Sequence, residues 1–197
     1  MNPPRGLSDI LDAIEPEPGD VKDVSVADVL REIGDESFAP MVLVVSVLLV
    51  SPLSAVPGTP TIGGLMVILI AGQWLAGRRH LWLPAVIRRR SVSAKRLVWA
   101  IRWLKPWAAW LDHNSKGRLM VLTLPPLTLV AKLLILAVAL TWPLLEILPM
   151  VTSVGALAVS LLAFGLMMRD GLWLAAGYAT VGGSVALVHW LAVEVQS

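Results

Sequence analysis

Apolar runs that are interrupted twice by proline, glycine and hydroxyl residues constrain this fold most strongly. SPLSAVPGTPTIGG, from Ser51 to Gly64, lies between two strongly apolar runs, and WPLLEILPMVTSVG, from Trp142 to Gly155, is a looser echo of it. The 197-residue chain is 56% hydrophobic and only 15% charged. Its mean hydropathy of +0.75 lies outside the usual soluble range. The sequence therefore predicts an integral membrane protein.

Hydropathy predicts an all-α, polytopic protein with about five membrane helices, built on two duplicated hairpins. Candidate spans lie at Ala39 to Val56, Thr61 to Ala76, about Leu127 to Leu145, Val151 to Met168 and Leu172 to Val193. The first two are shorter than the roughly 20 residues that cross the hydrocarbon core. Each must be a short crossing, extend into its flanks or turn back as a re-entrant helix, and the sequence leaves these alternatives open.

The two interrupted regions align with each other without a gap. Pro52 aligns with Pro143, 91 residues later, and the register continues through Gly64 and Gly155 to a second pair of LWL triplets. Roughly a third of the positions between 47 and 85 match, which indicates an internal duplication. Parallel repeats would place both Pro/Gly turns on one side, whereas re-entrant hairpins separated by an odd number of crossings would be inverted.

Two segments are predicted to precede the first hairpin. Residues 1–23 are acidic and proline-rich, which predicts a disordered tail with at most a short helix around Leu7 to Ile14. Residues 24–37 have the pattern of a short amphipathic helix, in which Ser25 is the N-cap and Asp28 completes a capping box. The first membrane hairpin then occupies residues 38–77, and the second hairpin with the final helix occupies residues 119–193.

The connector between the hairpins, residues 78–118, is basic and contains five tryptophans. Ser91 or Ser93 can cap a helix in which Leu97, Ile101 and Leu104 recur at helical spacing. This pattern predicts an interfacial amphipathic helix, with its apolar side toward the membrane and its cations toward lipid headgroups. Pro106 is expected to bend or end the helix.

Charge is strongly segregated along the chain, although its formal sum is only +2. Ten of the fourteen acidic residues precede Phe38, and eleven of the sixteen basic residues fall between Arg78 and Arg118. By the positive-inside rule the connector is cytoplasmic, and a first hairpin that returns to its starting side puts the N-terminus in the cytoplasm as well. The N-terminal residues lack the pattern of a signal peptide.

Two stretches carry a resemblance to a known family. FAPMVLVVSVLLVSPLSAVPGTPTIGGLMVILIAGQWLAGRRHLWLPAVIRRRSV, from Phe38 to Val92, and MMRDGLWLAAG, from Met167 to Gly177, resemble the exopolysaccharide synthesis ExoD family of bacterial membrane proteins. GRRHLWLP followed by IRRRS is the most specific part. The resemblance implies a role in exopolysaccharide production at the bacterial inner membrane, and it supplies no catalytic residue.

Candidate substrate-binding residues lie near the interruptions and at the helix ends that follow them. Arginines from the two halves could converge on a phosphate, for which the guanidinium is well suited, and an intramembrane carboxylate is a functional candidate because its burial is costly. Alternatively, these arginines are positive-inside anchors, and the Arg169 and Asp170 pair is an ion pair at the interface. The substrate-binding candidates are Gln73, Arg78, Arg79, Arg169, Glu146, Pro57, Gly58, Thr59 and Thr152, and the lipid-headgroup candidates are Arg88, Arg89, Arg90, Lys95 and Arg96.

Several classes of chemistry find no support in the sequence. The chain has no cysteine, no phosphate-binding loop, no dinucleotide fingerprint and no histidines at metal-ligand spacing, so we expect no catalytic residue, metal or cofactor. Beside transmembrane spans, the basic connector fits anionic lipid better than nucleic acid. A homodimer is compatible with the sequence.

The leading functional hypothesis is a non-enzymatic inner-membrane protein of exopolysaccharide production. It would act as a transporter or flippase-like handler of an anionic lipid or polyprenyl-phosphate carrier, because interrupted helices in duplicated halves mark binding sites in transporter folds. The alternative is a non-transporting scaffold or regulator that docks the polysaccharide synthesis proteins. Neither the substrate nor the direction of transport follows from the sequence.

Overall fold

The computed structural model describes residues 6–16, 23–28, 38–51, 54, 56, 58–78, 80–115, 118–145 and 149–194. Nearly all of the described elements are helices, which confirms the predicted all-α class; the exception is a pair of two-residue strands. The elements are α1 (Leu7–Ile14), β1 (Val24–Ser25), α3 (Phe38–Val50), α4 (Thr59–Leu75), α5 (Ala85–Arg88), β2 (Ser91–Val92), α6 (Ala94–Asn114), the 3-10 helix η2 (Met120–Thr123), α7 (Pro125–Leu145), α8 (Pro149–Met168) and α9 (Gly171–Glu194).

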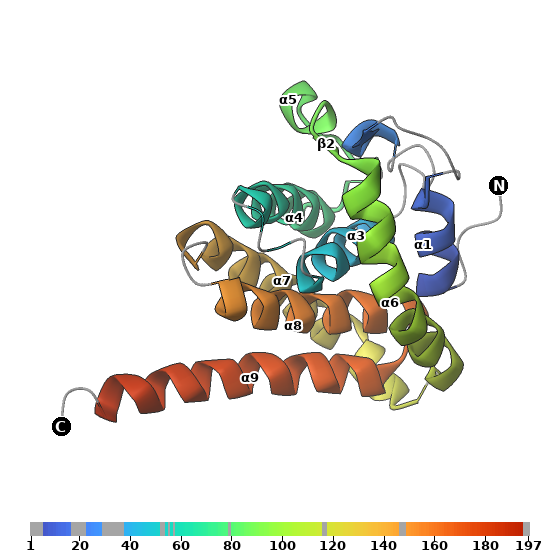
Figure 1. Ribbon diagram of the computed structural model, residues 1–197. Coiled ribbons are helices and arrows are strands. Elements are labelled where there is room, and N and C mark those ends of the chain that lie inside the picture. The colour runs from blue at the N-terminus through green and yellow to red at the C-terminus, as the bar shows by residue number, and fades with distance from the viewer. Residues whose placement is uncertain are drawn as a thin grey trace.

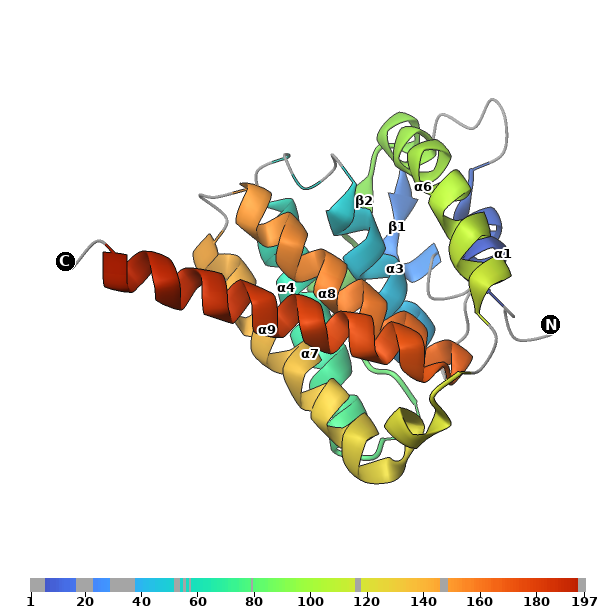
Figure 2. The same cartoon turned by 90° about the horizontal axis from the view of Figure 1, so that it is seen from below.

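Four helices form the centre of the molecule, two from each predicted hairpin (Figures 1 and 2). Besides the contacts within each hairpin, α3 packs mainly on α8, and α4 packs mainly on α7. Each helix of the first hairpin thus has a partner in the second, and exchanging the two hairpins reproduces the same pattern of contacts. Helix α9 lies against α8.

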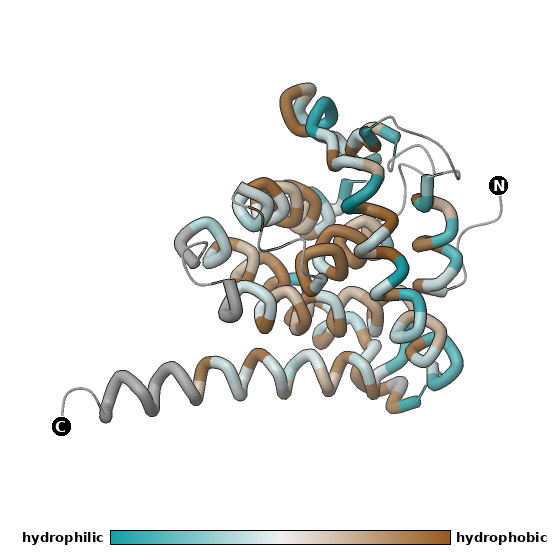
Figure 3. Tube along the Cα trace, viewed as in Figure 1, coloured by the Kyte–Doolittle hydropathy of each residue, from teal (hydrophilic) through white to brown (hydrophobic). Residues whose placement is uncertain are grey.

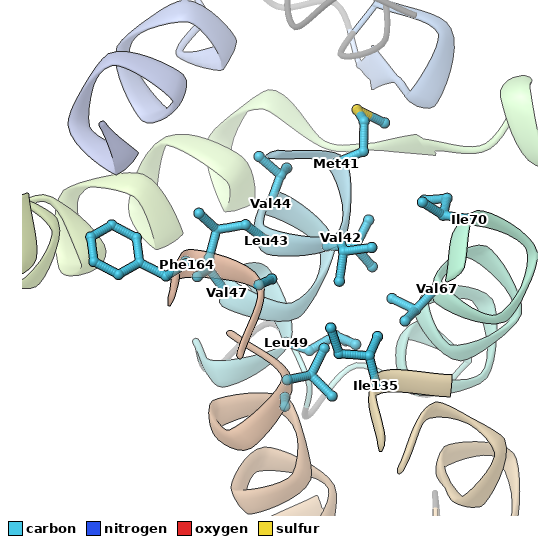
Figure 4. Close-up of a cluster of buried hydrophobic side chains, with 14 of the residues drawn as sticks. Met41, Val42, Leu43, Val44, Val47, Leu49, Val67, Ile70, Ile135 and Phe164 are labelled. Atoms are coloured by element: carbon cyan, nitrogen blue, oxygen red, sulfur yellow. The ribbon is translucent and has the colours of Figure 1, made fainter. Parts of the chain in front are cut away.

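Helix α3 supplies much of the core. Its sequence, FAPMVLVVSVLLV, is apolar on all sides, and a helix of that kind is stable only when it is surrounded. Met41 and Val42 are fully buried in one cluster, and Figure 4 shows Val42 pointing toward Val67 of α4 and Ile135 of α7. The single polar side chain of α3, Ser46, donates its hydroxyl proton to the carbonyl of Val42 at 2.8 Å.

The observed helices coincide with the predicted spans to within a few residues, except at the first span. That span was expected to reach Val56, but α3 ends at Val50, before the Pro/Gly-rich turn. In the described part of the chain, one helix is long and apolar enough to cross a membrane, α7 over Pro125–Pro143, with a mean hydropathy of 1.8. Helices α3, α4 and residues 152–168 of α8 are shorter apolar helices, so the five-span topology stays a prediction.

The predicted capping box is confirmed. The Ser25 N–H donates to Asp28 Oδ2 at 3.0 Å, and the Asp28 N–H donates to Ser25 Oγ at 3.2 Å. Ser25 also belongs to β1, which pairs antiparallel with β2 so that Val24 faces Val92 and Ser25 faces Ser91. The sequence did not predict this ribbon, because each strand is only two residues long.

Helix α6 continues through Pro106 to Asn114, so the proline does not end it. The face formed by Leu97, Ile101 and Leu104 was predicted to lie on the membrane, and this prediction is wrong. These side chains are only 2%, 0% and 5% exposed, because the face is covered by protein. Figure 1 shows α6 crossing the direction of α8 and α9.

Helix α1 has the bounds of the short helix that the sequence allowed within its disordered tail, but it packs on α6. Its apolar side chains, Leu7, Ile10, Leu11 and Ile14, are all buried. Asp112 of α6 accepts hydrogen bonds from the Leu7 and Ser8 N–H groups, both at 2.8 Å, and so caps the N-terminus of α1.

The other end of α1 is held by Lys105 of α6. Lys105 forms ion pairs with Asp12, at 2.8 Å, and with Glu15. The hydrogen bonds to Asp12 and, next, to Glu15 raise the pKa of Lys105. Figure 3 shows the hydrophilic positions gathering on α1, α5 and α6, away from the apolar central helices.

Candidate functional site

The two Pro/Gly interruptions meet at one end of the bundle. Ser54, in the turn between α3 and α4, lies 3.3 Å from Ser153 of α8, measured between their hydroxyl oxygens. Because Ser153 belongs to the second interrupted region and lies in the first turns of α8, both interruptions lie at the same end. This geometry agrees with the parallel arrangement of the two hairpins and not with the inverted one.

The aligned glycines Gly64 and Gly155 make room for one tryptophan. Trp142 of α7 is fully buried. A Cβ atom at Gly64 would lie 3.3 Å from the Trp142 Cβ, and one at Gly155 would lie 2.9 Å from its Nε1. Gly64 therefore allows close packing between the two hairpins, and Gly155 allows close packing between α7 and α8 within the second hairpin.

A cavity of about 210 Å³ lies between the β1–β2 ribbon, the first hairpin and the start of α6, and we call it the ribbon cavity. Met41 and Leu48 of α3 and Met66 of α4 contribute to its mainly apolar wall. Its polar lining includes Ser25 and Ser91 from the two strands. Two residues from different predicted groups also line it: Thr59, a substrate-binding candidate, and Arg90, a lipid-headgroup candidate.

The ribbon positions Arg90 at this cavity. The Arg90 carbonyl accepts a hydrogen bond from the Val26 N–H at 2.9 Å, directly beside the paired residues Ser25 and Ser91. The Arg90 side chain is exposed to solvent. An arginine in the lining of a mainly apolar cavity is suited to a ligand with an anionic group attached to a hydrocarbon chain.

Gln73 holds a loop. Its Nε2 donates to the Trp82 carbonyl at 2.7 Å, and its Oε1 accepts from the Trp82 N–H at 2.8 Å. The amide is thus paired with the backbone of the segment that follows α4. This arrangement gives the side chain a structural role that its place in the sequence did not indicate.

Arg78 and Arg169 lie just beyond the ends of α4 and α8, and both are exposed. Both helices end in the same type of turn: the Arg78 N–H donates to the Gln73 carbonyl, and the Asp170 N–H donates to the Gly165 carbonyl. Helix α4 has 17 residues and is therefore about 25 Å long, so Arg78 and Thr59 lie at opposite ends of the bundle. The predicted substrate-binding residues fall into two separate groups.

Asp170 is fully buried, although the sequence allowed for an ion pair with Arg169 at the membrane interface. Oδ1 accepts a hydrogen bond from the Leu172 N–H at 3.0 Å, which caps the start of α9, and Oδ2 lies 3.4 Å from the Ser115 hydroxyl. An aspartate directly before an apolar helix is a recognisable capping signal that the sequence analysis did not use.

The other candidates stay predictions. Gly58, with a φ of 85°, precedes α4 in the left-handed conformation that favours glycine, and Thr152 is fully buried. Like Arg90, the other lipid-headgroup candidates are exposed, namely Arg88, Arg89, Lys95 and Arg96. Pro57, Arg79 and Glu146 lie outside the described residues.

Sequence reasoning missed two features of this region. Ser25 and Ser91 share the ribbon cavity although they are far apart in the chain, and neither position carries a signal for that pairing. Lys132 of α7 lies with its Nζ 4.6 Å from the centre of the Trp74 ring of α4. Within the described residues, no group of three or more His, Cys, Asp or Glu side chains could hold a metal ion.

Together these features define a helical protein of two packed apolar hairpins, with a basic, tryptophan-bearing helix laid across them. The chain belongs to the family described as "Exopolysaccharide synthesis, ExoD", whose model it matches over residues 7–190. This confirms the resemblance seen in the sequence.

Two relatives extend the comparison. "Protein ExoD" of Rhizobium meliloti is 30% identical over 158 residues, which cover 79% of this chain and 65% of that protein. An uncharacterized protein of Synechocystis is 26% identical over 160 residues, which cover 78% of this chain and 72% of that protein. No solved structure matches the chain.

Proposed function

We propose that this chain is a multi-pass inner-membrane protein of exopolysaccharide production that binds an anionic lipid or polyprenyl-phosphate carrier in the ribbon cavity and acts as a transporter or flippase-like handler of it. The observation that carries the proposal is Arg90 at the edge of a mainly apolar cavity, with hydroxyl groups beside it. The family description supports the link to exopolysaccharide.

Exposed apolar side chains support the membrane location. Leu129, Leu133 and Leu140 of α7 are 50%, 49% and 54% exposed, and Val185 of α9 is 65% exposed. Apolar surface that extends over several helices of one molecule indicates contact with a membrane or a partner. The basic connector would face the cytoplasm, and the chain would be surrounded by anionic lipid.

The chemistry of the proposed binding is recognition without covalent change. The Arg90 guanidinium would donate two parallel hydrogen bonds to a phosphate, and the hydroxyl of Thr59 or Ser91 could donate a third. The apolar wall would hold the first carbon atoms of the lipid chain. Release toward the other side of the membrane would require the ribbon and the first hairpin to separate.

Replacing Arg90 tests the proposal. We expect Arg90→Gln to reduce polymer output in cells about tenfold, because a charge-assisted hydrogen bond to phosphate contributes roughly 1.5–3 kcal/mol. Arg89→Gln is the matched control, since Arg89 is also exposed, carries the same charge and does not line the cavity. Unchanged polymer output with Arg90→Gln, at equal protein level, would exclude the cavity as the working site.

The alternative, a non-transporting scaffold or regulator, needs a test other than truncation. Deleting residues 1–35 would remove the buried face of α1 and the strand β1, so loss of function would not separate the two proposals. Co-purification separates them. A scaffold should retain its synthesis partners and its output with Arg90→Gln, whereas a lipid handler should retain any partners and lose its output.

A further inference from the structure

An open apolar groove of about 310 Å³ lies on another side of the molecule from the ribbon cavity, and we call it the tryptophan groove. Leu43 and Val47 of α3 lie in its floor. One wall is formed by Trp103, Trp107 and Trp110 of α6, and the facing wall by Leu157, Leu161 and Phe164 of α8. The ribbon cavity and the tryptophan groove share no lining residue.

The groove offers almost no hydrogen-bonding group to a ligand. Its one serine, Ser160, already donates its hydroxyl proton to the Ala156 carbonyl at 2.7 Å. The volume is roughly twice that of an apolar cavity of about 150 Å³ that takes up a benzene ring, so it accommodates on the order of a dozen carbon atoms. A hydrocarbon chain matches both the chemistry and the size.

The tryptophans of α6 remain exposed beside this groove. Trp99, Trp103, Trp107 and Trp110 are 53%, 42%, 59% and 56% exposed. Their spacing of four, four and three residues places them along one side of the helix. Indole rings with an apolar body and one N–H prefer the boundary between lipid and water, which indicates a lipid as the occupant of the groove.

The positive charges of α6 favour an anionic lipid in the groove over a neutral one. Arg96 lies seven residues before Trp103, which places it on the same side of α6, about 10.5 Å from the start of the groove. Arg96 and its neighbour Lys95 are both exposed, and the acidic residue of α6, Asp112, is already bonded to the N-terminus of α1. The outward side of α6 therefore complements a negative headgroup.

The same charges disfavour a second copy of the chain as the occupant. A two-fold interface brings the same surface of each subunit together, so it would gather the exposed cations Lys95, Arg96 and Arg102 of both copies at one interface. Like charges brought together in this way oppose association. A lipid has no such conflict.

We propose that the tryptophan groove holds one acyl chain of an anionic phospholipid, with the headgroup bound at Arg96. This is a lipid site separate from the ribbon cavity, and it does not depend on any transport activity. Such a lipid would fix α6 against α3 and α8 and would extend the apolar surface of the bundle.

Photo-crosslinking of the full chain tests this site. The protein is reconstituted in vesicles that contain phosphatidylglycerol with a diazirine in its acyl chain, irradiated, and analysed by mass spectrometry for modified residues. We expect adducts concentrated on groove residues such as Leu157 and Leu161. The same chain attached to phosphatidylcholine should label the groove about fivefold less, the effect of roughly one basic residue at an anionic lipid.

Three variants make the test specific. Arg96→Gln should lower groove labelling by phosphatidylglycerol to the phosphatidylcholine level, whereas Arg89→Gln should leave it unchanged. Leu161→Trp should fill the groove and abolish labelling there while α7 residues such as Leu140 remain labelled. Equal labelling inside and outside the groove, with no effect of headgroup or Arg96, would overturn the proposal.

The two proposals fail independently. Arg90→Gln should not change groove labelling, because Arg90 does not line the groove. If Arg90→Gln lowers polymer output while the groove shows no selective labelling, the groove proposal is wrong and the ribbon cavity stands. If the groove is selectively labelled while Arg90→Gln leaves polymer output normal, the ribbon-cavity proposal is wrong and the groove proposal stands.

Discussion

Gly171, the first residue of α9, lies directly against the backbone of the loop that ends the connector, at Arg118 and Leu119. Its N–H donates to the Arg118 carbonyl at 2.7 Å. A Cβ atom added at this position would lie 2.0 Å from the Leu119 carbonyl oxygen, so no larger residue fits without movement of the backbone. Gly171 therefore joins the loop that ends the connector to the turn between α8 and α9, beside the contact between the Ser115 hydroxyl and Asp170.

Replacing Gly171 by alanine should be strongly destabilising. We expect Gly171→Ala to lower the free energy of unfolding by about 1–3 kcal/mol, the range for overpacking at a site that cannot relax. Gly182→Ala, in the interior of α9 with no atom within 4 Å of the added carbon, is the control and should be neutral or slightly stabilising. Thermal unfolding in detergent, followed by circular dichroism, compares the two variants. Equal midpoints would contradict the packing seen here.

At the scale of elements, α1 is attached to α6 by charges at both ends. Asp112 caps the N-terminus of α1, and Lys105 pairs with Asp12 and Glu15 near its C-terminus. A helix of eight residues is too short to be stable alone in water, so this helix depends on its contacts with α6.

Removing the cap should loosen α1. We expect Asp112→Ala to raise the rate of amide hydrogen exchange in residues 7–14 about fivefold, which corresponds to the roughly 1 kcal/mol that an N-terminal cap contributes. His113→Ala is the matched control, because His113 is adjacent and exposed. Exchange in α3 should remain unchanged in both variants. An α1 that exchanges as fast in the wild type as in Asp112→Ala would mean that the cap contributes nothing.

At the scale of the whole molecule, the two hairpins are joined at their turns as well as along their helices. The contact between the Ser54 and Ser153 hydroxyls ties the first interruption to the start of α8. This arrangement brings together two parts of the chain that align in sequence, although the contact itself is not between aligned positions.

A double cysteine variant tests this arrangement directly, because the chain has no cysteine of its own. We expect Ser54→Cys with Ser153→Cys to form an intramolecular disulfide under mild oxidation, seen as a mobility shift that reductant reverses, because the two side chains already lie within bonding reach. Each single variant is the control and should show no such shift. Failure of the double variant to oxidise would contradict the contact between the two turns, and the inverted arrangement would again be an alternative.

Local features were predictable to the extent that they depend on neighbouring residues. The Ser25 and Asp28 capping box was recognised because its two partners lie three residues apart. Thr59 and Arg90 were both singled out, but their common cavity was not foreseen because the strands that form it are two residues long. The role of Gln73 depends on the distant backbone groups of Trp82 that it meets, and composition does not reveal that.

The sequence by itself determined the helical class, the family and the positions of the apolar helices, because a long apolar run with proline and glycine at its ends is helical almost wherever it packs. Only the tertiary structure decided what each face meets. Leu97, Ile101 and Leu104 had the pattern of a membrane-facing stripe and are covered by protein, while the tryptophans of the same helix remain exposed. Hydrophobicity drives burial without specifying a partner, so the choice between lipid and protein depends on the shapes of the surfaces that meet.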